Sequence, residues 1–148
     1  MITKECENKK YCCFYASDFH LEMILLPYIK KNINKDKFMI FTEENLTESM
    51  KILLSRTNLD QNETKNMLDL NWDGKENNCF SEYDLNNSTI IINGSSNYIS
   101  EMNEKIRKIN PKKINIIDCY NINDNTLEPE TIQRNYDDIL NSRREKNV

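Results

Sequence analysis

The chain has 148 residues, of which 38% are hydrophobic and 30% are charged, and its formal net charge is −4. This size predicts one domain with a modest core, and the interspersed charges exclude the clustered basic face of a nucleic-acid-binding protein. No apolar run approaches about 18 residues and the N-terminus lacks the apolar segment of a secretory signal, so we expect a cytoplasmic protein without a membrane span.

The first third of the chain alternates strand and helix patterns. Lys10–Tyr15 is a run of strand formers, and apolar residues follow at helical spacing from Leu21 to Ile33. Pro27 lies inside this helical pattern, so we expect a kink or an irregular turn there. A second strand is predicted at Phe38–Phe41.

Two capping patterns predict the next helices. Asn45 with Glu48, and Asp60 with Glu63, have the spacing at which a helix-initial side chain and the third helical residue cap each other's backbone. Residues 69–87 lack a clear period, and we expect at most one short strand among them.

The second half repeats the alternation. A strand is predicted at Thr89–Asn93, and a helix with apolar positions from Tyr98 to Ile109 follows it. The last predicted strand is Ile114–Tyr120. A C-terminal helix is expected to begin near Pro129, and its proposed apolar positions are Ile132, Tyr136, Ile139 and Leu140, ahead of Arg143 and Arg144 in its last turn.

This order predicts an α/β protein. Strands joined by helical crossovers form a mainly parallel sheet that is covered on both faces. We expect a single three-layer Rossmann- or RecA-like domain over residues 1–148, with four or five strands flanked by helices. Residues 1–9 and 142–148 are expected to fray.

Gly94 stands at the junction between a predicted strand and the helix after it, and the chain has only two glycines. A glycine at such a turn permits a close approach that a Cβ would block. The sequence contains neither of the glycine-rich motifs that bind nucleotide phosphates. Free N–H groups at Gly94-Ser95-Ser96 could hold an anion, although a tight turn is the more common role.

Ligands of open parallel sheets bind beyond the carboxyl ends of the strands. Four predicted strand ends therefore define a candidate ligand-binding rim, made of Tyr15, Ser17, Asp18, His20, Glu43, Asn93, Gly94, Ser95, Ser96, Asp118 and Tyr120. The alternative is that Ser17, Asn45 and Ser96 only cap helices, which suits each of them.

Cysteine, histidine and acidic residues offer other chemistry. The five cysteines, without a C-x-x-C pattern, are expected to be free thiols. His20 with Cys12, Cys13 or Cys119 could form a metal site or a catalytic pair, and Asp18, Glu43, Glu44 and Asp118 could bind Mg²⁺ or act as catalytic carboxylates. Buried thiols and solvated acids are the commoner roles, so we assign no catalytic residue, metal or cofactor.

Several short stretches between Tyr11 and Asp60, and one near the C-terminus, carry a family resemblance: Phe14-Tyr15, Leu26–Ile33, Lys37–Phe41, Glu43–Thr47 and Ile116–Tyr120. In these features the chain resembles the MEDS domain, a sensory domain named for methanogen, methylotroph and dichloromethane-regulator proteins. The middle of this chain is shorter than in that family. The resemblance implies a Rossmann- or RecA-like sensory module without its own P-loop, and it carries over no ligand-binding residue.

We therefore expect a non-catalytic sensory or regulatory domain that binds a small ligand or a signalling partner. One alternative is a small Rossmann-like enzyme that uses the strand-end carboxylates or a Cys–His pair. Another is a stand-alone interaction subunit. A homo-oligomer is compatible with the sensory or regulatory domain and with the interaction subunit.

Overall fold

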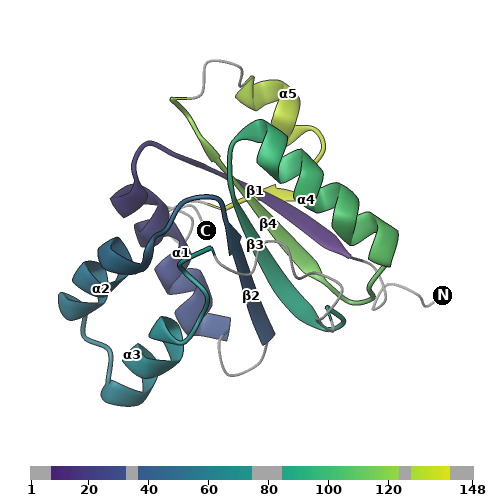
Figure 1. Cartoon of the computed structure of the whole chain (residues 1–148). Coiled ribbons are helices and arrows are strands. Elements are labelled where there is room, and N and C mark those ends of the chain that lie inside the picture. Colours follow the sequence, from purple (N-terminus) through teal and green to yellow (C-terminus); the bar gives the residue numbers. More distant parts are fainter. Residues whose placement is uncertain (1–7, 33–36, 75–84, 124–127, 141–148) are drawn as a thin grey trace.

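The computed structural model describes residues 8–32, 37–74, 85–123 and 128–140, which form a five-stranded parallel sheet with helices on both faces (Figure 1). This is the α/β, Rossmann-like fold predicted from the sequence. The elements in chain order are β1 (Lys9–Tyr15), α1 (Asp18–Asn32), β2 (Lys37–Thr42), α2 (Thr47–Ser55), α3 (Gln61–Leu68), β3 (Ser88–Gly94), α4 (Ser96–Ile109), β4 (Asn115–Asn121), α5 (Pro129–Gln133) and β5 (Asp138–Ile139).

The strand order in the sheet is β2-β3-β4-β1-β5, and every strand pair is parallel. β4 lies between β3 and β1, with Asp118 in register with Ile92 on one side and Cys12 on the other. All strands therefore point their carboxyl ends toward one edge. This edge is where the candidate rim was predicted.

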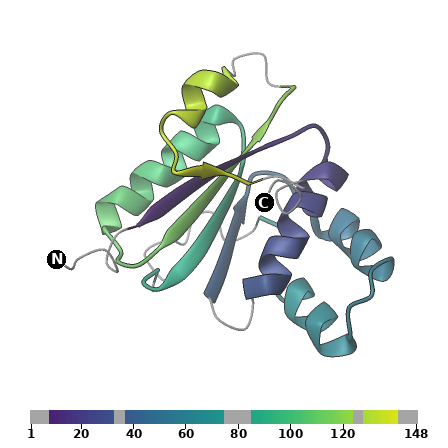
Figure 2. The same cartoon turned by 180° about the vertical axis from the view of Figure 1, so that it is seen from behind.

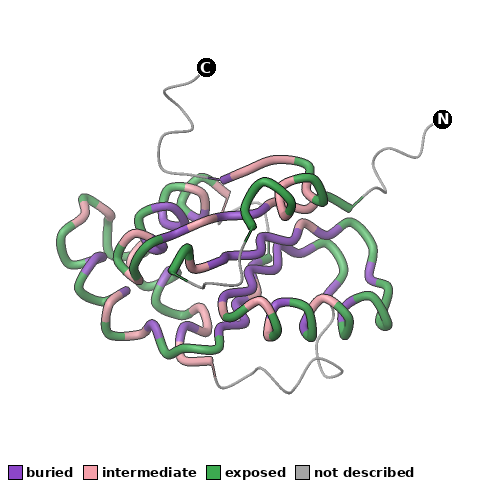
Figure 3. Tube along the Cα trace, turned by 90° about the horizontal axis from the view of Figure 1, so that it is seen from above, coloured by how far each residue is buried: buried purple, intermediate pink, exposed green. Residues whose placement is uncertain are grey.

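The strands at the centre of the fold are buried along most of their length (Figure 3), and alternation along them divides the core between the two faces of the sheet. Ile91 and Ile117 pack on the side of α1, α2 and α3, whereas their neighbours Ile90 and Ile116 pack on the side of α4. Figure 2 shows the helices on the two faces of the sheet from behind. The adjacent cysteines, Cys12 and Cys13, likewise belong to opposite faces, as predicted.

The C-terminal segment differs from the prediction. α5 ends at Gln133, and a fifth strand, β5, follows it, so Tyr136, Ile139 and Leu140 do not lie on a helix. The backbone of this segment pairs with β1: Asp137 N–H donates to the carbonyl of Lys10, and Leu140 N–H to that of Cys12. The segment therefore pairs with β1, alongside the strand, instead of forming the expected helical turns. Arg143 and Arg144 lie outside the described residues.

The helix starts were predicted in part. Asp60 and Glu63 form the expected capping box at α3. The pairing of Asn45 with Glu48 is wrong, because α2 begins at Thr47, whose N–H donates to Asn45 Oδ1. α1 continues through Pro27 to Asn32, and its buried apolar residues on both sides of the proline, such as Leu25 and Ile29, stabilise it against the lost hydrogen bond.

Two further expectations concern particular segments. The described parts of residues 69–87 before β3, namely 69–74 and 85–87, contain no strand, and 75–84 lie outside the described residues. In the portion of the chain that the structure describes, no helix has both the length and the apolar character needed to cross a bilayer.

Candidate functional site

A cavity of about 280 Å³ opens at the carboxyl edge of the sheet. Four strands contribute to it, because its lining comes from the ends of β1, β3 and β4 and from the turns after β2, β3 and β4. The lining residues are Tyr15, Glu43, Glu44, Gly94, Ser95, Asn121 and Asn123. Four of the residues chosen from the sequence belong to this lining: Tyr15, Glu43, Gly94 and Ser95.

A chain of buried hydrogen bonds links three strands beneath this cavity. The Tyr15 hydroxyl donates to Asn93 Oδ1 over 2.6 Å, and Asn93 Nδ2 donates to Thr42 Oγ1 over 3.1 Å. The Thr42 hydroxyl then donates to the carbonyl of Glu44 over 2.7 Å. Asn93 therefore supports the cavity from below, and burial raises the pKa of Tyr15, which keeps its hydroxyl protonated as a donor.

The turn at Gly94 brings the Glu43 side chain against the start of α4. Glu43 Oε1 accepts a hydrogen bond of 2.9 Å from Ser95 N–H, and an added Cβ on Gly94 would meet this same oxygen at 2.8 Å. The carboxylate thus occupies the position where an anion could have bound at the helix N-terminus. Ser95, not Ser96, caps α4, because its Oγ accepts from Tyr98 N–H.

Acidic side chains concentrate beside the cavity. Burial raises the pKa of Glu44, and the nearby carboxylates of Asp18 and Glu43 raise it further. These three acids come from the start of α1 and the turn after β2. The predicted acidic rim is therefore present in these residues, whereas Asp118 lies elsewhere.

Ser17 and His20 form the N-terminal cap of α1. Ser17 Oγ accepts a hydrogen bond of 3.2 Å from His20 N–H, and His20 Nδ1 accepts one of 3.0 Å from Ala16 N–H. Neither residue lines the cavity. The capping interpretation is thus confirmed for Ser17, while Ser96 is only the first residue of α4.

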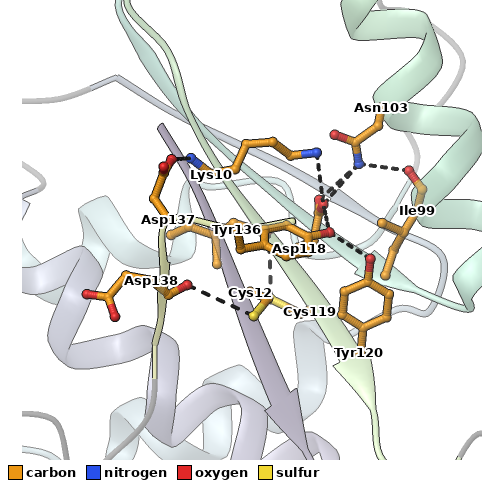
Figure 4. Close-up of polar contacts among 11 residues, drawn as sticks. Lys10, Cys12, Ile99, Asn103, Asp118, Cys119, Tyr120, Tyr136, Asp137 and Asp138 are labelled. Carbon is orange, nitrogen blue, oxygen red and sulfur yellow. Dashed lines mark hydrogen bonds and ion pairs between the residues drawn. The ribbon is translucent and has the colours of Figure 1, made fainter. Parts of the chain in front are cut away.

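Asp118 and Tyr120 do not reach the rim, which corrects the prediction for both residues. β4 continues to Asn121, so Asp118 lies within the strand and its side chain points to the face covered by α4 (Figure 4). The residues of this strand end that line the cavity are Asn121 and Asn123, which were not among the predicted rim residues. The predicted strand ended at Tyr120, one residue before the end of β4, so the choice of side chains was wrong rather than the position of the strand.

The fully buried carboxylate of Asp118 is the centre of a polar cluster (Figure 4). Tyr136 donates to it over 2.6 Å, Asn103 Nδ2 donates over 3.1 Å, and Lys10 Nζ lies 3.9 Å away. Tyr120 bonds to the Tyr136 hydroxyl over 2.7 Å. Burial raises the pKa of Asp118, while these donors and Lys10 oppose the rise.

The Asp118 cluster joins three parts of the fold: β1, α4 and the segment after α5. Its carboxylate is inaccessible to solvent and its partners come from the domain itself. We interpret it as a structural connection that holds the C-terminal segment on the sheet, because a satisfied buried polar network fixes the packing of the elements it joins.

The described cysteines and the histidine do not assemble a reactive site, while Cys6 and Cys79 lie outside the described residues. Cys12, Cys13 and Cys119 are buried, free thiols, whereas His20 belongs to the α1 cap. Burial, with neighbouring acidic groups, raises the pKa of Cys12 to about 11. A protonated, buried thiol is a poor nucleophile. Among the described residues, no three His, Cys, Asp or Glu side chains are arranged to hold a metal ion.

A second depression, of about 430 Å³, lies on α3 and the loop before it. Although it is larger, one helix and its preceding loop supply all its lining, from Leu59 to Asp69. No strand end or buried polar group converges on it. The cavity at the sheet edge is therefore the better candidate site.

Comparison of the chain with models of known protein families, with curated proteins and with solved structures finds no match. The interpretation of the site consequently rests on its geometry.

Proposed function

We propose that this chain is a non-catalytic sensory or regulatory domain that binds a small ligand in the cavity at the carboxyl edge of its sheet. The observation that carries the proposal is the convergence of four strand ends on one cavity with a hydrogen-bonded floor. Parallel α/β sheets bind their ligands at this position. The sensory role comes from the resemblance of the first third of the chain to the MEDS domain.

The non-catalytic part of the proposal is supported by the state of the side chains that could react. The three described thiols are buried, and the Tyr15 hydroxyl is engaged with Asn93. An enzyme that uses the acids near the cavity is the alternative. The site favours binding over acid–base catalysis because Glu43 is already engaged with the backbone of Ser95.

Ligand binding can be tested by thermal denaturation of the full chain with a panel of neutral, cationic and anionic metabolite-sized compounds. A ligand at 100 times its Kd stabilises the folded state by about 2.7 kcal/mol. In a domain of this size, each kcal/mol raises Tm by about 2–4 °C. We expect at least one compound to give a saturable rise.

Two tryptophan substitutions locate the binding site. Asn123→Trp fills the cavity and should abolish the rise in Tm, whereas Asn62→Trp, on an exposed position of α3, should leave it unchanged. A flat response to the whole panel, or an undiminished rise in Asn123→Trp, would contradict the proposal.

A further inference from the structure

Among the described residues, the charged side chains that line the cavity are all acidic. Glu43 and Glu44 belong to this described lining, which contains no lysine or arginine, and Asp18 lies close enough to raise the pKa of Glu44. The other polar residues of the described lining, Tyr15, Ser95, Asn121 and Asn123, are uncharged. A ligand in this cavity therefore meets a negative field.

Phosphates and carboxylates are poorly suited to this site. The N–H group of Ser95, which would attract an anion at the start of α4, already donates to Glu43 Oε1. An incoming anion would have to displace that carboxylate and would also face Glu44. The positive end of the α4 dipole therefore already interacts with a carboxylate of the protein itself, that of Glu43.

A buried carboxyl oxygen without a hydrogen-bond donor lies near one of these acids, Asp18. Glu22 is fully buried in α1, one turn after Asp18 on the same side of the helix. Ser49 donates to its Oε2, but its Oε1 has no hydrogen-bond partner among the described residues. Burial raises the pKa of Glu22, which does not belong to the described lining of the cavity, so the negative field there comes from Glu43, Glu44 and Asp18.

Given the proposed binding function, on which this inference rests, we propose that the cavity takes a small organic cation. Its ammonium group lies against Glu43 and Glu44, with Asp18 adding to the negative field, and the amides of Asn121 and Asn123 contact the remainder of the ligand. A volume of about 280 Å³ suits a compound of metabolite size. We favour an organic cation over a metal because the described acids are not arranged as a metal site.

Isothermal titration of the full chain with three four-carbon probes separates the charge classes. The probes are putrescine, 1,4-butanediol and succinate, which are dicationic, neutral and dianionic. At about 0.15 M ionic strength, where distant surface charges are screened, we expect putrescine to bind at least about tenfold more tightly than the diol, and succinate not to bind.

Glutamine substitutions show whether the cavity is responsible. Glu44→Gln should weaken putrescine binding at least about tenfold, and Glu43→Gln is a second variant with the same expectation. Glu48→Gln removes an equal charge from an exposed position of α2 and should leave the Kd unchanged. Far-UV circular dichroism and the urea midpoint establish that each variant is folded.

The remaining outcomes separate this inference from the proposed function. Equal Kd values for Glu44→Gln and Glu48→Gln, tighter binding of the diol or succinate, or displacement of putrescine by Mg²⁺ would overturn the organic-cation assignment. If a neutral or anionic compound binds and Asn123→Trp abolishes its binding, the cavity is a ligand site of another class. If no compound binds, both proposals are wrong.

Discussion

At the scale of single residues, Gly94 is required by the space around its α-carbon. Its φ is not in the left-handed region, where Gly74 is found, so backbone strain is not the reason. An added Cβ would lie 2.5 Å from Tyr98 Cδ2 and 2.8 Å from Glu43 Oε1. The glycine thus allows Glu43 to approach the start of α4.

We expect Gly94→Ala to destabilise the domain by about 1–3 kcal/mol, because an added methyl group in a packed site forces side chains to move. Chemical denaturation measures this cost. In a Glu43→Ala background the cost should fall, since one of the contacting atoms is gone, and a double-mutant cycle reports the coupling. A substitution without effect would show that the turn is not tightly packed.

Glu22 predicts a pH dependence of stability. Burial raises its pKa, and Asp18 raises it further, so its protonated form is favoured in the folded state. The stability it contributes is complete below the unfolded-state pKa and is lost as the pH rises through the folded-state pKa. Removing this carboxyl group should therefore stabilise the folded state most at high pH.

Accordingly, the free energy of unfolding of Glu22→Gln, relative to that of the parent chain, should increase as the pH rises from about 5 to about 8. Urea denaturation at both values measures the difference. Glu48→Gln, at an exposed site, provides the matched control and should show no such trend. A pH-independent effect of Glu22→Gln would mean that Glu22 has an ordinary pKa.

At the scale of elements, the segment after α5 depends on side-chain hydrogen bonds as well as on β5. β5 is only two residues long, and Tyr136 adds a hydroxyl that bonds to both Asp118 and Tyr120. Lys10 Nζ also lies 5.1 Å from the centre of the Tyr136 ring. Tyr136 is therefore the main side-chain anchor of this segment.

Two Tyr→Phe substitutions should have different effects. Tyr136→Phe removes one donor from the buried Asp118 carboxylate, leaving Asn103 and Lys10 beside it, and should cost about 1–3 kcal/mol. Tyr98 has a buried hydroxyl without a hydrogen-bond partner among the described residues, so Tyr98→Phe should be neutral or stabilising. Urea denaturation compares the two variants. Equal costs would refute this role of Tyr136.

The elements that were predicted well are those whose strand or helix pattern is clear in the local sequence. The β1–α1–β2 and β3–α4–β4 units have strands of strongly apolar residues and helices with clear periodicity, and the structure contains all of them. The C-terminal segment was mispredicted because Tyr136 and Leu140 fit a helical period equally well. Contacts with β1 and Asp118, distant in the sequence, decide their conformation.

The candidate site was also predicted only in part. The residues that follow β2 and β3 were found because each strand ends at a clear polar turn. At the end of β4, Asp118 and Tyr120 were selected in place of Asn121 and Asn123. Asp118 instead binds Asn103 and Tyr136, and such contacts between distant parts of the chain leave no local sequence signal. The buried role of Glu22 depends on the packing of α1 against α2 and has no local signal.

At the scale of the whole molecule, one sheet separates two cores. Ile90 and Ile91 are adjacent, fully buried residues of β3, and each belongs to a different core. Because β3 is shared, losing either core should disrupt the same sheet. We therefore expect the two faces to unfold together.

Ile90→Ala and Ile91→Ala test this cooperativity. Each should cost about 2–5 kcal/mol through lost burial and a residual cavity. Trp72, the single tryptophan, is buried in the core on the side of α1, so its fluorescence can be compared with far-UV circular dichroism. The two transitions should coincide in both variants; an Ile90→Ala transition seen only by circular dichroism would show independent cores.

The contact between Glu43 and Ser95 means that this domain supplies its own counter-ion to α4. Where other proteins bind a free anion at the N-terminus of a helix, this chain places the carboxylate of its own Glu43 there. Glu43 thereby contributes, together with Glu44, to the preference of the cavity for the charge of a ligand. Glu43→Gly should vacate the position, and inorganic phosphate should stabilise that variant while leaving the parent chain unchanged.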